Sequence, residues 1–267
     1  MTSSCKLDFS FDPQPLRTDL AQIRSDEWVS HFNKGYFEGQ WIGIALRSIG
    51  GLASRLYSDQ NTPAPYQDTP VLDRCPNVRA LLKTFRCPLR SVRFLKLEAG
   101  AVIREHRDYS LGFEFGQIRL HVPLVTNDKV DFFLDAHRIL MQPGECWYLD
   151  LSLPHWVKNR GSSDRVHLVI DCEVNEWLRC LLPPPKVDEE SSAEASHESS
   201  PADLERFRQV VHRELELQQR LRQTSDRESF IRLVVSLGHR RGYKFAAADA
   251  ETAMRAAQQS WIEGWMD

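Results

Sequence analysis

The chain has 267 residues, of which 42% are hydrophobic and 27% are charged, as in an ordinary globular protein. Its formal net charge of −3 excludes a global basic field that would gather nucleic acid or an anionic membrane. No apolar run approaches the roughly 20 residues that span a bilayer, and the first residues lack the pattern of a secretory signal. We therefore expect a cytoplasmic protein with reduced cysteines and without a nucleic-acid or membrane partner.

The first third of the chain has a mixed pattern. It predicts helices near residues 17–32 and 74–86, and a strand around WIGIALRS at 41–48. From about residue 91 onward, short runs of β-branched and aromatic residues alternate with turn signals such as TNDK, QPGE and NRGSSD. These runs are SVRFLKL, QIRLHVPLV, VDFFLDA, HRILM, ECWYLDLS and RVHLVIDCEV. Many short strands at this spacing predict a mainly β sandwich or barrel, with a jelly roll as the leading candidate.

A change of composition ends the strand-rich region. Residues 183–203, PPPKVDEESSAEASHESSPAD, have Val187 as their only large apolar residue and predict a flexible linker. Beyond the linker, apolar residues recur at helical spacing and predict a small all-α domain of three helices over 204–267. The sequence thus predicts a first domain over 1–182, with its β core at about 91–173.

Three residues with metal-binding chemistry lie in the strand-rich region. His106 and Asp108, in EHRD, point the same way at or near a strand end, because side chains i and i+2 share a face. Two histidines and one carboxylate suit Fe(II) and leave coordination positions open. His155, in LSLPHW, is the natural third ligand, since two strands meeting at one end of a barrel would bring it to the pair. An HxD pair alone is also a common surface pattern, and that alternative stays open.

Two predicted strands each carry an Arg-x-His face. Arg119 and His121 alternate with apolar residues in QIRLHVPLV, as do Arg165, His167 and Asp171 in RVHLVID. A guanidinium inside a barrel is costly unless it pairs with an anion, and its fork suits a carboxylate. A dicarboxylate cosubstrate such as 2-oxoglutarate would supply that anion. The alternative is that these polar residues lie on the solvated face of antiparallel strands.

Four motifs resemble, in order, those of the aspartyl/asparaginyl/proline β-hydroxylase family of Fe(II)- and 2-oxoglutarate-dependent oxygenases: AGAVIREHRDYS, IRLHVPLVTN, PGECWYLDLSLPHWVKNRG and DRVHLVIDCE. The resemblance is dense over about residues 91–173. It implies a double-stranded β-helix, of the jelly-roll or cupin-like kind, with flanking helices.

The same resemblance implies roles for individual residues. It implies His106, Asp108 and His155 as Fe(II) ligands, and O2 as a reactant. It also implies that Arg165 binds the far carboxylate of 2-oxoglutarate. Arg119 and His121 are implied to line the same cosubstrate pocket.

The HxD motif separates two branches of the family. The animal aspartyl hydroxylases have glycine where Asp108 stands here, whereas the bacterial cis-proline hydroxylases share HRDY and SLPH with this chain. The resemblance therefore implies hydroxylation of an amino-acid residue of the Asp, Asn or Pro type, free or peptidyl, with release of succinate and CO2. The alternative is a non-catalytic jelly-roll binding or sensing protein whose C-terminal helices contact a partner.

The C-terminal region has a resemblance of its own. LQQRLRQTSDRESFIRLVVSLGHRRGYKFAAADAETAM resembles the small helical domain of the Nif-eleven type, which recurs as the leader region of some ribosomally made peptides. This resemblance adds a ribosomal peptide precursor to the candidate substrates. A helical cap or a dimerisation element is the alternative for these helices, and the sequence does not indicate an oligomeric state.

Overall fold

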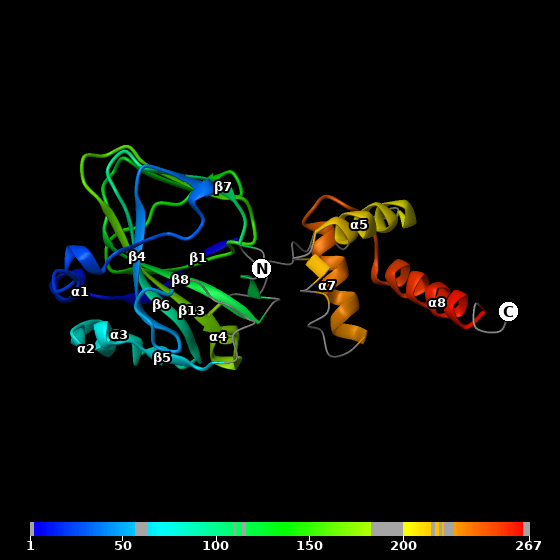
Figure 1. The fold of residues 1–267 in the computed structure, drawn as a ribbon, viewed down its shortest axis with the longest axis horizontal. Helices are drawn as coiled ribbons and strands as arrows, with labels where there is room; N and C mark the ends of the chain where they lie inside the picture. Colours follow the sequence, from blue (N-terminus) through cyan, green and yellow to red (C-terminus); the bar gives the residue numbers. More distant parts are fainter. Residues whose placement is uncertain are drawn as a thin grey trace. The chain divides into compact units, whose positions relative to one another are not determined.

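The chain folds into two compact units, Met1–Lys186 and Val187–Asp267, which are coloured along the sequence in Figure 1. The computed structural model describes residues 3–56, 64–108, 111–113, 116–182, 200–214, 217–218, 221 and 227–263. Residues 183–199 of the predicted linker lie outside the described residues, and a helix already begins at Pro201. Each unit is therefore described by itself.

The larger sheet of the first unit has eight antiparallel strands. They are β1 (Ser4–Ser10), β2 (Val29–Ser30), β4 (Trp41–Ile49), β5 (Tyr66–Asp68), β6 (Leu89–Leu97), β8 (Gln117–Val125), β11 (Glu145–Leu149) and β13 (Arg165–Glu173). Their order is β1-β11-β8-β13-β6-β4-β2, and β5 pairs with β4. The two Arg-x-His strands, β8 and β13, are therefore neighbours at the centre of the sheet.

The smaller sheet has five antiparallel strands. They are β3 (Phe37–Glu38), β7 (Val102–His106), β9 (Val130–Leu134), β10 (His137–Arg138) and β12 (His155–Asn159). In the order β10-β9-β12-β7-β3, the strand that carries His106 lies beside the strand that carries His155. A buried apolar cluster joins the two sheets, with Leu97 and Val169 from the larger sheet and Ile103, Phe132 and Val157 from the smaller.

Helices cover the outer face of the larger sheet. They are α1 (Pro13–Leu20), α2 (Pro70–Asp73), α3 (Pro76–Leu82) and α4 (Glu176–Leu181). The first three begin with proline in the first turn, where no intrahelical N–H bond is lost. Leu72 and Leu81 from these helices share one buried cluster with Phe94 of β6 and Leu120 of β8. In Figure 1, α2 and α3 lie on the side of β6 and β13 away from β7.

Because helices cover the outer face of the larger sheet, that face is apolar, and some polar side chains point toward the space between the sheets. The apolar residues of β8, among them Ile118 and Leu120, pack outward against the helices. Because side chains alternate along a strand, Arg119 and His121 point between the two sheets. The mainly β, double-stranded β-helix with flanking helices that the sequence predicts is confirmed.

Some predicted elements match the strands and helices of the structure, and others do not. QIRLHVPLV corresponds to β8 residue for residue, and WIGIALRS lies within β4. The helix predicted over 17–32 is wrong beyond Leu20, because Val29 and Ser30 form the edge strand β2 and pair with Gly43 and Ile42 of β4. Pairing with a distant strand overrides the local preference there.

The QPGE turn before β11 has the geometry that its sequence predicts. The N–H of Glu145 donates to the carbonyl of Gln142 at 3.2 Å, and Gly144 has a φ of +84°. That positive φ, which follows a proline, is typical of a type II turn. The turn also lies against the N-terminal segment, since the N–H of Phe11 donates to the carbonyl of Gly144 at 2.9 Å.

Replacing Gly144 with alanine is expected to lower the free energy of unfolding by about 2–5 kcal/mol. The left-handed backbone costs alanine about 1–2 kcal/mol, and the added Cβ would overlap the carbonyl oxygen of Phe11 and force the segment to move, about 1–3 kcal/mol more. Gly50 is the control, because its φ is +70° but no atom lies within 4 Å of an added Cβ. Urea denaturation of Gly144→Ala and Gly50→Ala measures both; an equal loss would contradict the role of the Phe11 contact.

The second unit is helical. Its described helices include α5 (Pro201–Arg213), α7 (Arg227–His239) and α8 (Ala247–Glu263). The RGYKF segment returns the chain onto α7: Gly242 turns with a φ of +82°, and the ring of Phe245 packs where a side chain at Gly238 would overlap it. Among the residues that the structure describes, no helix has both the length and the apolarity needed to cross a bilayer.

Candidate metal and anion site

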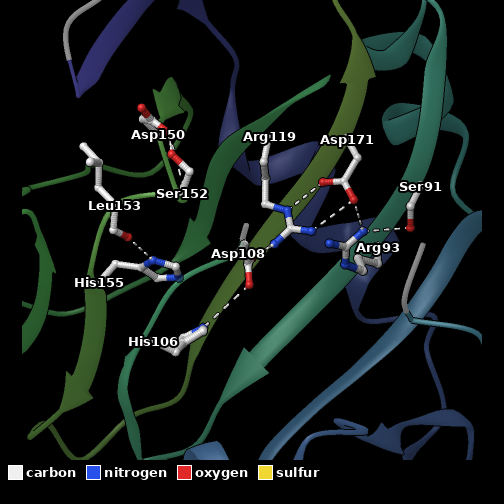
Figure 2. Close-up of polar contacts among 10 residues, drawn as sticks. All are labelled: Ser91, Arg93, His106, Asp108, Arg119, Asp150, Ser152, Leu153, His155 and Asp171. Carbon is white, nitrogen blue, oxygen red and sulfur yellow. Dashed lines mark hydrogen bonds and ion pairs between the residues drawn. The ribbon is translucent and has the colours of Figure 1, made fainter. Parts of the chain in front are cut away.

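The three predicted metal ligands lie together at one end of the barrel. His106 is the last residue of β7 and His155 the first of β12, and the two are directly opposite each other in the antiparallel ladder. Asp108 follows β7 by two residues, and its N–H donates to the carbonyl of Leu151 at 2.8 Å. One ligand atom from each of the three residues lies within 4.8 Å of the others. Figure 2 shows the three side chains gathered in this way.

Both imidazole rings present the same nitrogen to the site. Nδ1 of His106 lies 2.8 Å from the carbonyl oxygen of Arg104, and Nδ1 of His155 lies 3.0 Å from that of Leu153. A carbonyl oxygen only accepts, so both Nδ1 atoms carry the proton. In a neutral ring with this hydrogen bond the lone pair is on Nε2, and this is the tautomer that a metal ligand uses when its other nitrogen donates to the protein.

A short turn places the carbonyl that orients His155. The carboxylate of Asp150 accepts from the N–H of Ser152 at 3.2 Å and from its hydroxyl group, and the N–H of Leu153 donates to the carbonyl of Asp150 at 3.1 Å. Such side-chain bonds to the following backbone are typical of Asp in turns. The DLSLPH segment therefore forms a turn that delivers His155 to the start of β12.

The charge states in this cluster suit a metal ion. Burial lowers the pKa of His155 to about 4, so that its ring is neutral at neutral pH. Burial alone would raise the pKa of Asp108, but the Arg119 guanidinium and the two histidines hold it below its usual value. Two imidazoles and one carboxylate are the donor set of non-haem Fe(II) sites.

Aromatic side chains lie beside His106. The ring of Tyr36 is centred 5.1 Å from that of His106, and the ring of Trp41 is centred 6.4 Å away. His31 stacks on Trp41, and burial lowers the pKa of His31 to about 3. The metal cluster thus has an aromatic wall on one side, made by Tyr36, Trp41 and His31.

Arg119 lies beside the metal cluster and contacts two carboxylates. Its Nη1 donates to Asp108 Oδ2 at 2.6 Å, and its Nε donates to Asp171 Oδ1 at 2.6 Å. Burial alone would lower the pKa of Arg119, but both carboxylates raise it above its ordinary value. Asp171 is also bound by Arg93; burial alone would raise its pKa, but the two arginines hold it low. Arg119 therefore carries a full positive charge, and the carboxylates of Asp108 and Asp171 already balance that charge.

Arg165 has the opposite surroundings. The residue is 3% exposed, and its Nε has no hydrogen-bond partner among the described residues. Its Nη2 donates to Nδ1 of His167 at 2.8 Å, and its guanidinium lies 5.8 Å from the centre of the Phe132 ring. Burial lowers the pKa of Arg165 to about 9, so it is positively charged at neutral pH, and no carboxylate among the described residues forms an ion pair with it.

Two neutral histidines complete this second cluster. Nδ1 of His121 lies 3.3 Å from Nδ1 of His167. A guanidinium only donates, so Nδ1 of His167 accepts from Arg165, and the ring keeps its N–H on Nε2. Burial, followed by the nearby charge of Arg165, holds the pKa of both histidines well below its ordinary value. Arg165 therefore remains the positive charge of the cluster.

A cavity of about 310 Å³ opens onto Arg165 and His167. Its wall also includes Asn127, Phe132 and Met141, and its volume is at the lower end of the range for small-molecule pockets, about 300–1,000 Å³. The ring of Phe132 is also centred 6.5 Å from that of His155 and parallel to it. Phe132 thus lies between the cavity with its unmatched cation and the metal cluster.

The structure separates the predicted site residues into two groups. His106, Asp108, His155 and Arg119 form one, and Arg165, His121 and His167 form the other, which lines the cavity through Arg165 and His167. The solvated-face alternative for the Arg-x-His strands is wrong, because His121, Arg165 and His167 are 5%, 3% and 1% exposed.

The sequence reasoning missed two residues at this site. Asp171 was placed on the polar face of β13 without a role, and Arg93 was not singled out. The signal for Arg93 is in SVRFLKL, where an arginine replaces an apolar residue on the inward face of β6, with Val92 and Phe94 in the outer cluster.

Fold and cluster together define a double-stranded β-helix protein with a candidate non-haem metal site. A family model described as aspartyl/asparaginyl β-hydroxylase matches residues 12–174. Since that match covers more than half of the sequence, the chain belongs to the aspartyl/asparaginyl β-hydroxylase family, as its motifs predict.

The chain is similar to a curated relative that is named as a proline hydroxylase. This relative is the L-proline cis-4-hydroxylase of Rhizobium meliloti (strain 1021), 31% identical over 178 residues, which are 64% of this chain and 61% of the relative. The match thus spans about three fifths of the length of that relative. Among solved structures, an oxidoreductase of the 2OG-Fe(II) oxygenase family from Burkholderia pseudomallei is 11% identical, with a TM-score of 0.41, over 60% of this chain and 79% of that one. A prolyl-4-hydroxylase from Pseudomonas putida is 14% identical, with a TM-score of 0.39, over 65% and 93%.

Proposed function

We propose that the protein is an Fe(II)- and 2-oxoglutarate-dependent dioxygenase that hydroxylates an amino-acid residue. The observation that carries the proposal is the cluster of His106, Asp108 and His155, in which both histidines donate Nδ1–H to backbone carbonyls and leave Nε2 as the nitrogen available to a metal ion. This donor set fits Fe(II) and leaves coordination positions for other ligands.

Bound there, Fe(II) would supply the activation of O2: one oxygen atom enters a C–H bond of the substrate, and the other enters 2-oxoglutarate as it loses CO2 and becomes succinate. The protein has separate tasks. His106, Asp108 and His155 would hold the ion, and the interior between the sheets would keep bulk water away from it. Arg165 would bind the distal carboxylate of 2-oxoglutarate in the cavity, since within the described part of the chain its Nε has no hydrogen-bond partner.

Arg119 and His121 stay predicted residues of the cosubstrate pocket. The contacts of Arg119 are with Asp108 and Asp171, and those of His121 are with His167. Arg165 is thus the group in this set whose surroundings favour a direct bond to the cosubstrate, while His121 would act by holding His167.

The aromatic wall beside His106 supports a substrate with a compact apolar ring. Tyr36 is 41% exposed and offers a flat apolar face beside His106, whereas Trp41 is 7% exposed and stacks on His31. Proline has such a ring, and the curated relative is named as a hydroxylase of L-proline. Free L-proline is therefore the first substrate to test, followed by prolyl, aspartyl and asparaginyl peptides, including a ribosomal peptide precursor. The proposal includes a cytoplasmic location, which its six free thiols support.

With Fe(II) and 2-oxoglutarate, addition of the true substrate is expected to raise succinate release at least about tenfold above the uncoupled background. The expected order is L-proline first, because of the aromatic wall. The assay measures succinate and the hydroxylated product together, in a screen of free amino acids and peptides with the full chain. D-proline is the control, since it has the same ring and the opposite configuration at Cα. Failure of the protein to bind metal would instead support a non-catalytic binding or sensing protein.

A further inference from the structure

We propose that Asp171 is a positioning residue of the metal site: held by Arg93, it fixes Arg119, which in turn orients the carboxylate of Asp108. The inference rests on the proposed function, because Asp108 is the proposed carboxylate ligand. The four side chains form a row of alternating charge that starts on β6, crosses β13 and β8, and ends at the metal cluster. Figure 2 shows this row from Arg93 to Asp108.

At the metal end of the row, the two carboxylate oxygens of Asp108 have different neighbours. Oδ2 accepts from Nη1 of Arg119 at 2.6 Å, whereas Oδ1 lies 4.0 Å from Nε2 of His106. Asp108 lies beyond the end of β7, so the strand ladder does not orient its side chain. The bond to Arg119 therefore determines which oxygen faces the histidines.

Arg119 can orient Asp108 because its own plane is fixed. Its Nε and Nη2 donate to the two oxygens of Asp171, at 2.6 and 3.1 Å. Such a two-pronged pairing sets both the position and the rotation of a planar guanidinium. Arg119 and Asp171 are also directly opposite each other in the β8–β13 ladder. With two of its nitrogens held by Asp171, the guanidinium aims Nη1 at Asp108.

Asp171 is held in turn from the next strand. Nη1 of Arg93 donates to Asp171 Oδ2 at 2.9 Å and to the hydroxyl of Ser91 at 2.7 Å. The side chains of Arg93 and Asp171 are 4% and 3% exposed, so water does not compete for these bonds. The anchor of the row is thus inside the sheet, away from the open end of the barrel.

Stability alone is a poor reason for this row of charges. Replacing buried ion pairs with apolar residues of similar volume is often neutral or stabilising, because desolvation offsets their attraction. Groups behind a metal ligand, in contrast, set its direction, and losing them typically weakens metal binding about 10- to 100-fold. The continuous connection from Arg93 to Asp108 is what such a role requires.

Asp171→Asn tests the proposal in metal-free full-length protein titrated with Co(II). Its amide presents an N–H to one arginine donor, so the two-pronged bond is lost and Arg119 can rotate. We expect Co(II) affinity, measured by calorimetry, to fall about 10- to 100-fold and the visible absorption of bound Co(II) to change shape. Asp164→Asn is the matched control: this carboxylate is 43% exposed, pairs with Lys96 and precedes β13 by one residue. Its Co(II) affinity is expected to stay within about twofold of wild type.

The outcomes separate this inference from the proposed function. If wild type binds no stoichiometric Co(II), or if Asp108→Ala binds it as tightly as wild type, the metal site itself is wrong. If Asp108→Ala loses affinity while Asp171→Asn keeps the wild-type affinity and spectrum, the positioning role alone is wrong. If Asp171→Asn fails to fold, Arg119→Lys gives the same test, since an ammonium keeps the charge but lacks the fork. In the double variant of Asp108 and Asp171, no loss beyond that of Asp108→Ala is expected.

Discussion

Asp108→Ala is expected to reduce substrate-dependent succinate formation at least about 100-fold. Loss of a residue behind a metal ligand costs about 10- to 100-fold, so loss of the ligand itself should cost at least as much. The fold should persist, because Arg119 keeps its two-pronged bond to Asp171 when Asp108 is removed. The measurement is succinate release at saturating 2-oxoglutarate and Fe(II), with circular dichroism to confirm the folded state.

Glu105→Ala is the control for that variant. Glu105 also carries a carboxylate in the EHRD motif, but it alternates with His106 along β7 and is exposed. Its removal is expected to leave succinate formation within about twofold of wild type, since isolated surface charges contribute little. Full activity in Asp108→Ala, or an equal loss in both variants, would contradict the assignment of Asp108 as a ligand.

Arg165→Gln is expected to weaken 2-oxoglutarate binding about 30-fold or more. Removing one partner of a buried, hydrogen-bonded charge pair costs about 2–5 kcal/mol, and the lower value corresponds to about 30-fold. Without 2-oxoglutarate the variant should be at least as stable as wild type, because it buries one unmatched charge fewer. The two effects have opposite signs, which a general loss of structure would not produce.

Thermal unfolding with and without 2-oxoglutarate measures both effects on metal-free protein. The ligand should raise the Tm of wild type, since it binds the native state alone, and it should leave the Tm of Arg165→Gln nearly unchanged. Arg160→Gln is the control, because Arg160 lies before the same strand but is 65% exposed and pairs with Asp131. Equal stabilisation of all three proteins by 2-oxoglutarate would show that the anion binds elsewhere.

Period-two patterning predicts the long central strands because it is strong over nine residues. In β8 and β13, every second residue is apolar and packs in one cluster, so the sequence alone indicates both the extent and the faces of the strand. The two-residue strand β2 contains no period at all. It exists because Val29 lies opposite Gly43 of β4, a partner that no local window around Val29 includes.

The same distinction applies to the site. The EHRD spacing and the distal His155 predict the metal cluster, because i and i+2 residues share a face in any strand. Alternation also places Arg119 inside the barrel, but it cannot supply the partner of Arg119. That partner is Asp171 because the β8–β13 register puts the two residues opposite each other. Register follows from the whole sheet and its turns, and for this reason Arg93 and Asp171 were missed.

The helices that cover the outer face of β6, β8 and β13 have a consequence for how this enzyme family can change. Much of the apolar packing that stabilises the unit lies outside the barrel, between α1, α2, α3 and the sheet. Some inward-facing positions of those strands, such as those of Arg93, Arg119 and Arg165, can therefore hold polar residues while the outer apolar core is kept. Substitutions at such inward-facing positions can therefore change the substrate during evolution while the protein stays folded.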